Sequence, residues 1–331
     1  MKLVRYSQKT KLPSNSAVAV GNFDGLHRGH QKLLTKLVAD SKKLGLQSVV
    51  CTFSPLPWQT IALEVAQSSD VSKVPQATLS SLRTKIELLQ QYEIDIMLLV
   101  RFNPAFRSLL PAAFIKDFLV NQLNTHHLIT GQDFRFGFAR RGGAEQLAQA
   151  QQAGLFSYAP VDAYPDEQNK ISSSRVRELL TDGDLQNANK LLGYRYFITG
   201  RVVQGNGLGG KLGFPTANLN LQAFVPSATG VYLCLAHIEN QTKGAEVPKG
   251  LPALANFGYR PTVGSATSSK KFVAEAHILN FNENIYGKLL KLELIEYLRP
   301  EKKFAKLEEL TAQIKQDRET ALKILHNNPP M

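Results

Sequence analysis

The feature that most constrains the fold is an alternation of short apolar runs with amphipathic helical patterns in the first half of the chain. Apolar and β-branched runs, which favour strands, occupy residues 17–20, 48–53, 95–102, 127–130 and 156–161. Helical patterns lie between them, at residues 30–44, 79–92, 112–123 and 143–153. Strands that alternate with helices predict a doubly wound α/β fold, in which a parallel sheet carries crossover helices on both faces. Ligands of such folds bind beyond the carboxyl ends of the strands.

From residue 194 onward the pattern changes to strands and turns. Runs such as GVYLCLAHIE and LLKLELIEYLR are separated by Pro and Gly, which predicts an antiparallel sheet or small barrel. A helical pattern at residues 306–325 closes the chain, and residues 182–193 are typical of a linker helix that ends at Gly193. Because 331 residues exceed the usual size of one domain, we predict two domains, residues 1–183 and 184–331.

Composition and charge narrow the class of protein. No window approaches the roughly 20 apolar residues of a membrane span, and the first residues lack the apolar core of a secretion signal. Cys51 and Cys234 lie in strand-like runs, which predicts buried thiols in a reducing compartment and a cytoplasmic protein without a membrane partner. The net charge is +12, with 21 basic against 15 acidic residues before residue 184 and 18 against 12 after it. This even distribution favours small polyanions such as nucleotides over nucleic acid. Nothing in the sequence indicates an oligomeric state.

The stretch AVAVGNFDGLHRGHQKLL, residues 17–34, combines a strand, a glycine turn and a helix start. Gly21 and Gly25 allow the backbone to approach a ligand closely. His27 and His30 lie on one side of the first helical turn, where free N–H groups and the helix dipole favour an anion. Spacing alone leaves three interpretations open: a metal site, helix-terminal histidines that satisfy backbone groups, and side chains that stabilise the phosphates of a nucleoside triphosphate. The metal interpretation lacks further ligands at a typical zinc spacing.

Three segments carry a resemblance to a known family. GNFDGLHRGH resembles the nucleotidyltransferase signature G-x-F-D-x-x-H-x-G-H, and ISSSRVRELL (171–180) resembles its downstream I-S-S-T-x-x-R segment. GQDFRFG (131–137) resembles a stretch of bacterial FAD synthetases. The resemblance implies a Rossmann-like domain that transfers AMP from ATP to FMN, with His27 and His30 as catalytic residues. It implies that ATP is bound by Gly21, Asn22, Phe23, Gly29, Ser172, Ser173, Ser174 and Arg177, and flavin by Asp133, Phe134 and Phe136.

Structural alternatives stand beside these roles. Serines at a helix start are also typical N-caps, and the alternating Phe134 and Phe136 are also typical of a strand that faces a core. The sequence departs from the family at Leu56, in TFSPLP, where the family usually has histidine.

A second glycine-rich stretch, GNGLGGKLGFPTAN, covers residues 205–218. It matches both the dinucleotide fingerprint and the P-loop pattern, but both motifs require a helix directly after the loop, and Pro215 argues against one there. It resembles instead the riboflavin kinase signature G-x-L-G-F-P-T-A-N, with supporting stretches at residues 230–236, 255–264, 275–287 and 296–304. Together the two sets resemble the bacterial bifunctional riboflavin kinase/FAD synthetases over most of the chain.

This second resemblance implies that ATP and Mg²⁺ phosphorylate riboflavin to FMN on a riboflavin kinase-like barrel. Glu275 is the candidate base for the ribityl 5′-hydroxyl, and Thr216 and Asn218 offer hard oxygen ligands for Mg²⁺. The implied ATP-binding residues are Gly205, Gly207, Gly210, Lys211 and Gly213, and the implied flavin contacts are Arg260 and Arg299, for which ion pairs are the alternative. The sequence departs from the family at Leu208 and Gly210, where arginine is common, and at Asn280, where aspartate is usual.

The predicted function is therefore a two-domain flavin-cofactor enzyme with ATP, riboflavin and FMN as substrates. Two alternatives stand beside it. One is an FMN adenylyltransferase whose kinase half is impaired or only binds flavin. The other is a non-catalytic flavin-sensing or RNA-binding regulator.

Overall fold

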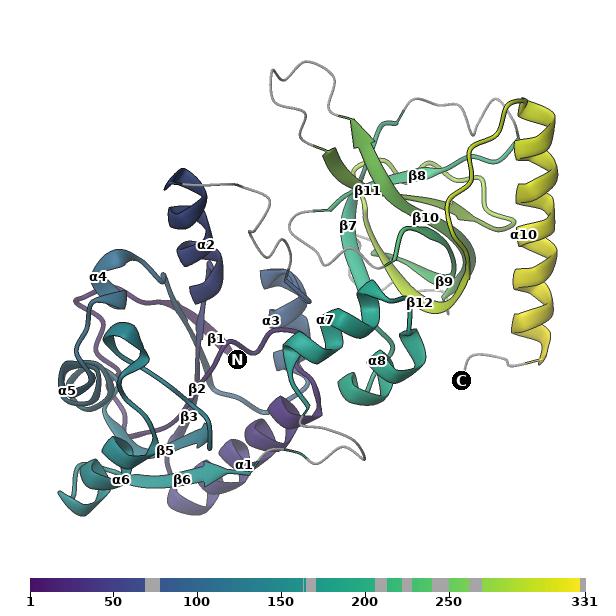
Figure 1. The fold of residues 1–331 in the computed structure, drawn as a ribbon. Helices are drawn as coiled ribbons and strands as arrows, with labels where there is room; N and C mark the ends of the chain where they lie inside the picture. Colours follow the sequence, from purple (N-terminus) through teal and green to yellow (C-terminus); the bar gives the residue numbers. More distant parts are fainter. Residues whose placement is uncertain are drawn as a thin grey trace. The chain divides into compact units, whose positions relative to one another are not determined.

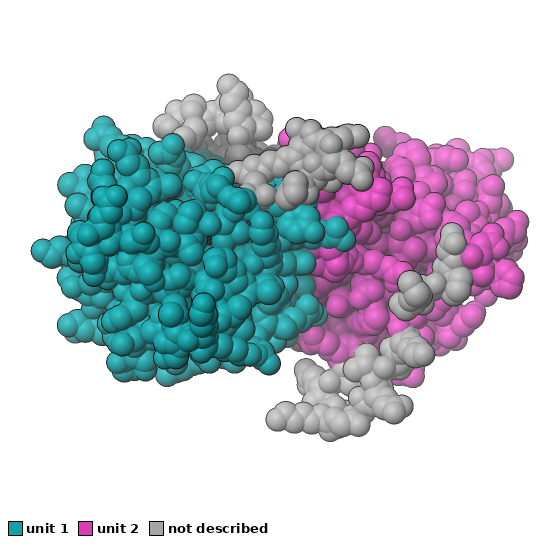
Figure 2. Space-filling view, turned by 90° about the horizontal axis from the view of Figure 1, so that it is seen from below, with its two compact units in different colours: residues 1–76, 82–173 teal, residues 77–81, 174–331 magenta. Residues whose placement is uncertain are grey.

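The computed structural model describes residues 1–68, 78–162, 164, 171–205, 213–221, 228–239, 250–261 and 270–327. The chain forms two compact units (Figure 2). The first comprises residues 1–76 and 82–173, and the second comprises residues 77–81 and 174–331. The domain boundary predicted from the sequence falls at Gly183, in the turn between helices α7 (Ser173–Thr181) and α8 (Leu185–Leu192).

The first unit is built on a six-stranded sheet in the order β1-β4-β3-β2-β5-β6, in which all neighbours are parallel (Figure 1). Its strands are β1 (Lys2–Arg5), β2 (Ser16–Val20), β3 (Gln47–Phe53), β4 (Ile96–Val100), β5 (Thr125–Gly131) and β6 (Ser157–Val161). From β2 the chain adds β3 and β4 on one side, and then adds β5 and β6 on the other. The order therefore reverses between β2 and β5, and this switch point is where open α/β sheets bind ligands.

Helices cover both faces of this sheet, as the sequence predicts. They are α1 (Arg28–Leu44), α2 (Pro57–Ser68), α3 (Leu82–Gln90), α4 (Pro104–Arg107), α5 (Pro111–Ala113), the π-helix η2 (Phe114–Gln122), the 3-10 turn η3 (Phe138–Arg140) and α6 (Ala144–Gln152). Val18 and Val20 share one core with the π-helix and α6. Because side chains alternate along a strand, Ala17 and Ala19 point to the opposite face. There α1 packs against β2, β3 and β5.

The second unit contains a closed barrel in the order β10-β11-β8-β7-β12-β9 (Figure 1). Its strands are β7 (Phe197–Val203), β8 (Ala217–Asn220), β9 (Gly230–Glu239), β10 (Leu251–Pro261), β11 (Lys270–Ile278) and β12 (Leu289–Arg299). The terminal helix α10 (Leu307–Asn327) lies along the outside of the barrel, where Ala321 packs against Val231, Leu233 and Leu254. Both the barrel and the terminal helix are confirmed.

The structure differs from the sequence-based expectations at several places. The pattern at residues 112–123 is a short α-helix followed by the π-helix. The segment after β5 forms no strand, because only an isolated bridge joins Phe136 to Gly142. Strand β1 and helix α2 were not expected from the sequence.

Candidate active sites

A pocket of about 880 Å³ opens at the carboxyl ends of the parallel strands in the first unit. Its walls include Val20, Gly21, Asn22 and Phe23 after β2, His27, Gly29, His30 and Leu33 at the start of α1, residues 131–137 after β5, and Ile171, Ser172 and Ser173 before and at the start of α7. The pocket thus lies at the switch point between β2 and β5, where the doubly wound fold predicts it.

The turn that joins β2 to α1 has an unusual backbone. Phe23 (φ 45°), Gly25 (φ 73°) and Leu26 (φ 38°) all adopt positive φ, which only glycine adopts without strain. The side chains of Phe23 and Leu26 are 1% and 2% exposed, so the surrounding core holds the backbone in this conformation. Strain of this kind is concentrated at ligand sites, where it fixes the direction of backbone groups.

The two histidines form a stacked pair at the start of α1. His27 is the N-cap of the helix, and its Nδ1 accepts the backbone N–H of His30 over 3.4 Å. The imidazole rings lie 3.7 Å apart between centroids, with 18° between their planes. A Cβ at position 29 would lie 3.2 Å from the His27 ring, so the glycine at that position leaves room for the stack. The cap interpretation of His27 is thus confirmed, and it coexists with a place for both rings on the pocket wall.

His30 is held as a neutral imidazole. Burial lowers the pKa of His30 well below its usual value of 6.5, and electrostatic interactions with His27 and Lys85 lower this pKa further. Its Nδ1 is buried without a hydrogen-bond partner. In this conformation the chain leaves one ring nitrogen of His30 unsatisfied at the pocket.

The serine segment reaches the pocket through two of its three serines. Ser172 and Ser173 line it, and the Ser173 hydroxyl donates to the carbonyl of Asp24 over 2.9 Å. This bond ties the start of α7 to the glycine turn. Ser174 and Arg177 lie further along α7, in the part of the helix that belongs to the second unit. Their contribution to ATP binding stays a prediction.

The segment after β5 forms a wall of the pocket. Asp133, Phe134 and Phe136 all line it. The rings of Phe134 and Phe136 stack with centroids 5.7 Å apart. Phe136 is also 5% exposed and packs against Phe114, so it belongs to the core as well as to the pocket wall.

Further aromatic residues line the pocket that the sequence did not single out. They are Phe53 at the end of β3, Trp58 in α2, Phe102 after β4, Phe106 in α4, Phe114 at the start of the π-helix, and Tyr164. Trp58 is the single tryptophan of the chain. Leu56, which replaces the family's usual histidine, is 3% exposed and is not part of the pocket wall. The departure from the family at Leu56, just before α2, was the one feature of the sequence that pointed to this segment as part of the site.

The barrel of the second unit carries a row of polar residues on three neighbouring strands. Asn218 of β8 is directly paired with Glu275 of β11, and Glu275 is paired with Asn256 of β10. Side chains at directly opposed positions point to the same face of a sheet. The flanking residues Ala274, Ala276 and Leu219 are buried and point to the opposite face. The two predicted side chains of this site, Asn218 and Glu275, therefore lie next to each other outside the barrel core.

The amide of Asn218 lies against Gly205. A Cβ at position 205 would lie 2.1 Å from Asn218 Nδ2 and 2.9 Å from its Oδ1, so a side chain there would require the Asn218 amide to move. Thr216 lies one residue before β8, on the same side of the chain as Asn218. Gly213 has a positive φ of 81° in the turn before this segment. Gly207, Gly210 and Lys211, and the side chain of Arg260, lie outside the described residues.

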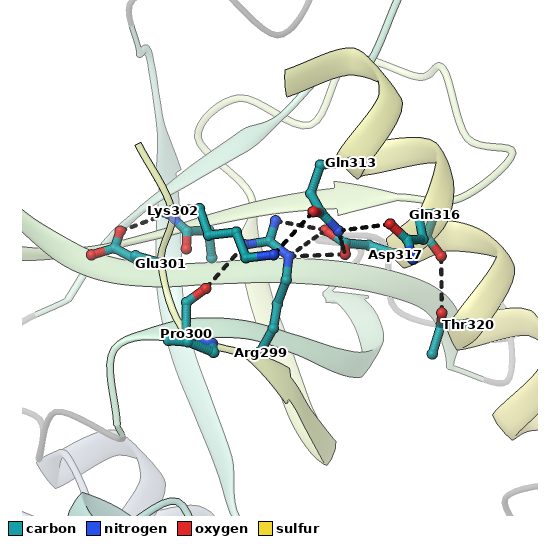
Figure 3. Close-up of polar contacts among 9 residues, drawn as sticks. Arg299, Pro300, Glu301, Lys302, Gln313, Gln316, Asp317 and Thr320 are labelled. Atoms are coloured by element: carbon teal, nitrogen blue, oxygen red, sulfur yellow. Dashed lines mark hydrogen bonds and ion pairs between the residues drawn. The ribbon is translucent and has the colours of Figure 1, made fainter. Parts of the chain in front are cut away.

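Arg299 forms an intramolecular ion pair (Figure 3). Its Nε and Nη2 donate to the carboxylate of Asp317 on α10 over 2.9 and 2.7 Å, and its Nη1 donates to the carbonyl of Pro300 over 3.0 Å. Of the two interpretations of Arg299, the structure shows the ion pair. The pair lies in the interior and not at the surface, because the two side chains are 14% and 7% exposed. Two of its nitrogens thus bond to α10, and the role of Arg299 as a flavin contact stays a prediction.

The residues present fit a hard divalent cation in the second unit. Thr216 and Asn218 supply neutral oxygens, and the carboxylate of Glu275 is adjacent. Mg²⁺ in phosphoryl-transfer sites is held by few protein oxygens together with water and substrate phosphates. Among the described residues, no three His, Cys, Asp or Glu side chains cluster as a metal site. The metal interpretation of His27 and His30 therefore has no further ligands in the part of the chain that the structure describes.

Family models match both units of the chain. A model for FAD synthetase matches residues 9–175, and one for riboflavin kinase matches residues 192–325. A bifunctional riboflavin kinase/FMN adenylyltransferase from Escherichia coli (strain K12) is 37% identical over 323 residues, covering 97% of each chain. A protein of the same name from Buchnera aphidicola subsp. Schizaphis graminum is 36% identical over 325 residues, covering 98% of each chain.

A solved structure supports the fold over nearly the whole chain. It is described as a macrolide-efflux protein from Streptococcus pneumoniae, with a TM-score of 0.80, 29% sequence identity, and coverage of 96% of this chain and 98% of the other. In the described residues, no helix has the length and apolar character needed to cross a membrane. The two family matches and the full-length relatives show that the chain belongs to the family of bifunctional riboflavin kinase/FMN adenylyltransferases.

Proposed function

We propose that residues 1–183 transfer the adenylyl group of ATP to FMN, and that residues 184–331 phosphorylate riboflavin to FMN. The product of the second domain is the flavin substrate of the first. The observation that carries the proposal is the placement of the stacked histidines, the glycine turn and the phenylalanine segment around one pocket at the switch point of the sheet.

In the first domain, a phosphate oxygen of FMN attacks the α-phosphorus of ATP. The bond between the α-phosphorus and the oxygen bridging to the β-phosphorus breaks, so FAD forms and pyrophosphate leaves. Catalysis of such a step is mainly positioning and electrostatics. The Nδ1 of His27 accepts a backbone N–H, so the neutral ring carries its proton on Nε2 and donates from that atom. His30 is also neutral, and it supplies a second imidazole N–H beside the first.

In the second domain, Glu275 takes the proton of the ribityl 5′-hydroxyl, and that oxygen attacks the γ-phosphorus of ATP. The bond from the γ-phosphorus to the oxygen bridging to the β-phosphorus breaks, and FMN and ADP result. Thr216 and Asn218 are the residues that would hold Mg²⁺. When bound, Mg²⁺ neutralises negative charge on the phosphates. The pairing of Asn218 with Glu275 supports this arrangement, because directly opposed residues of neighbouring strands lie side by side.

The assignment of activities to domains is tested in the full-length protein with the variant Glu275→Gln. FMN formation from riboflavin and ATP should fall by about 100- to 10,000-fold, the usual contribution of a general base. FAD formation from supplied FMN should be unchanged. Glu283→Gln, an exposed carboxylate in the same unit, is the matched control and should leave both rates intact. If Glu275→Gln lowers FAD formation from FMN equally, the division of activities is wrong.

We further propose a cytoplasmic location for both reactions. Its support is that Cys51 and Cys234 are buried free thiols, as the sequence predicted. Burial raises the pKa of both thiols, so neither is a reactive thiolate.

A further inference from the structure

A buried lysine lies beneath the glycine turn without lining the pocket. Lys85 of α3 is 4% exposed, and its Nζ donates to the carbonyl oxygen of Asn22 over 2.7 Å and to the hydroxyl of Thr52 over 3.2 Å. The Thr52 hydroxyl donates to the same carbonyl over 3.1 Å. The Asn22 oxygen is thus held by side chains from two elements, α3 and β3.

Stability does not explain a lysine at this position. An ammonium group taken out of water loses its hydration, and the loss is only partly offset by hydrogen bonds to neutral oxygens. Burial lowers the pKa of Lys85 to about 8, although the carboxylate of Asp24 opposes this shift. A methionine side chain of similar length would fill the space without the desolvation of an ammonium group, although it would leave the buried carboxylate of Asp24 without the charge that faces it. The Asn22 carbonyl would keep Thr52 as a donor.

The position of the anchored Asn22 carbonyl indicates that Lys85 orients the backbone of the glycine turn. Asn22 directly precedes Phe23, the first of the turn residues with positive φ. A trans peptide is planar, with its C=O and N–H pointing in opposite directions. Fixing the Asn22 carbonyl at Lys85 therefore directs the N–H of Phe23 away from the lysine. Both Asn22 and Phe23 line the pocket, whereas Lys85 does not.

We propose that Lys85 is a positioning residue for adenylyl transfer: by anchoring the Asn22 carbonyl, it holds the strained glycine turn in the orientation that receives the phosphates of ATP. The inference rests on the function proposed above for the first domain. Lys85 acts through the Asn22 peptide and touches no substrate. The titratable groups around Lys85 interact in two steps. The carboxylate of Asp24 faces Lys85, and the ring of His30 faces both Lys85 and His27.

The test is the full-length variant Lys85→Met, assayed for both reactions in the same preparation. We expect kcat/KM for FAD formation from FMN and ATP to fall by about 100-fold, the effect of misplacing a reacting group by about 1 Å. FMN formation from riboflavin should be unchanged. The rate of FAD formation should fall per folded molecule, whatever the melting temperature does, because Lys85→Met also leaves the buried carboxylate of Asp24 without the charge that faces it. A purely structural lysine predicts a lower melting temperature with an unchanged rate per folded molecule.

A second readout is the pH profile of FAD formation. Removing the charge of Lys85 raises the pKa of His30, so the acid limb of the profile should move to higher pH in Lys85→Met. Thr52→Val, which removes the other donor to the Asn22 carbonyl, should lower FAD formation less than Lys85→Met does. Combining the two substitutions should cost less than the product of the separate effects, because both act on one carbonyl.

Lys42→Met is the matched control, since Lys42 is 64% exposed and pairs with Glu93 at the surface. It should change neither rate. The proposal is overturned if Lys85→Met forms FAD at the wild-type rate, or if both activities and the melting temperature fall together. If Lys85→Met does not fold, Thr52→Val provides the test. FAD formation by Thr52→Val at the wild-type rate would then overturn the proposal. A wild-type chain that forms no FAD would refute the proposed function instead, independently of Lys85.

Discussion

Asn218 of β8 lies directly opposite Glu275 of β11, and the amide of Asn218 fills the space above Gly205 in which any other residue would place its Cβ. The candidate metal ligand and the candidate base are therefore held together by strand register and not by a flexible loop. Register also explains why two residues almost sixty positions apart in the sequence act at one place. The arrangement makes the position of Asn218 depend on a residue with no side chain.

Gly205→Ala should selectively impair riboflavin phosphorylation. The added methyl group would lie 2.1 Å from Asn218 Nδ2, so the amide must move away from its place beside Glu275. We expect FMN formation to fall by about 100-fold, with an increased requirement for Mg²⁺, while FAD formation from FMN stays intact. Rates measured across a Mg²⁺ titration test this. Gly154→Ala serves as a control, because nothing lies within 4 Å of a Cβ there, although its positive φ of 73° strains any side chain. Wild-type FMN formation by Gly205→Ala would show that Asn218 is not a ligand.

The double variant His27→Ala/His30→Ala should lose FAD formation and keep FMN formation. Loss of positioned donors to a charged transition state costs about 100- to 1,000-fold in rate for each donor. The measurement is product formation from FMN and from riboflavin, separated by chromatography. His126→Ala removes an exposed histidine whose Nδ1 lies 3.1 Å from the Asn124 carbonyl, and it should change neither rate. An equal fall of both activities would mean that the two histidines are needed for the folding of the whole chain and not specifically for adenylyl transfer.

The stability of the first unit should decrease as the pH falls below about 6.5, the usual pKa of an unfolded histidine. The folded-state pKa of His30 lies well below that value because the ring is buried. Between the two pKa values the unfolded chain binds more protons, so acid favours unfolding. Denaturant unfolding of wild type and His30→Gln from pH 7.5 to 5.5 measures the difference, which should shrink in the variant. A titration of the His30 ring at or above 6.5 by nuclear magnetic resonance would contradict this.

The pair formed by Arg299 and Asp317 should be needed for stability of the second unit. Arg299→Met leaves a carboxylate that is 7% exposed without its partner, and we expect a loss of about 3–5 kcal/mol in the free energy of unfolding. Arg299→Met/Asp317→Leu should recover most of that loss, because neither charge then remains buried. Chemical denaturation of the single and double variants makes the comparison. A double variant that regains stability but cannot bind riboflavin would support Arg299 as a flavin contact.

Flavin binding in the first unit should quench the fluorescence of Trp58. The pocket wall contains this residue, and the chain has no other tryptophan, so the signal arises from one site. Addition of FMN should reduce the emission with a saturation curve that matches the KM for FAD formation. Trp58→Phe gives the background. Unchanged emission at FMN concentrations that saturate FAD formation would place the flavin elsewhere.

The sequence predicts the architecture because the main elements follow from local patterns. The apolar runs of β2 to β6 and the helical spacing of α1 need no distant partner to be recognised. Strand β1 escaped this reasoning, since its four residues are mostly exposed and it is a strand only through its pairing with β4. The π-helix also escaped, because helical spacing does not distinguish hydrogen-bond patterns along a helix.

For the sites, the sequence by itself determined which residue types could handle phosphate, since His27, His30, Asn218 and Glu275 stand in short motifs. Only the tertiary structure decided which of these residues lie close together, and which other residues hold them in position. In the sequence, Lys85 is an ordinary charged residue of a short helix. It is buried and bonded to the Asn22 carbonyl only because α3 packs beneath the glycine turn. Arg299 finds Asp317 only because α10 returns along the barrel. Burial, register and the resulting electrostatics are properties of the folded chain, so no local pattern could have assigned either role.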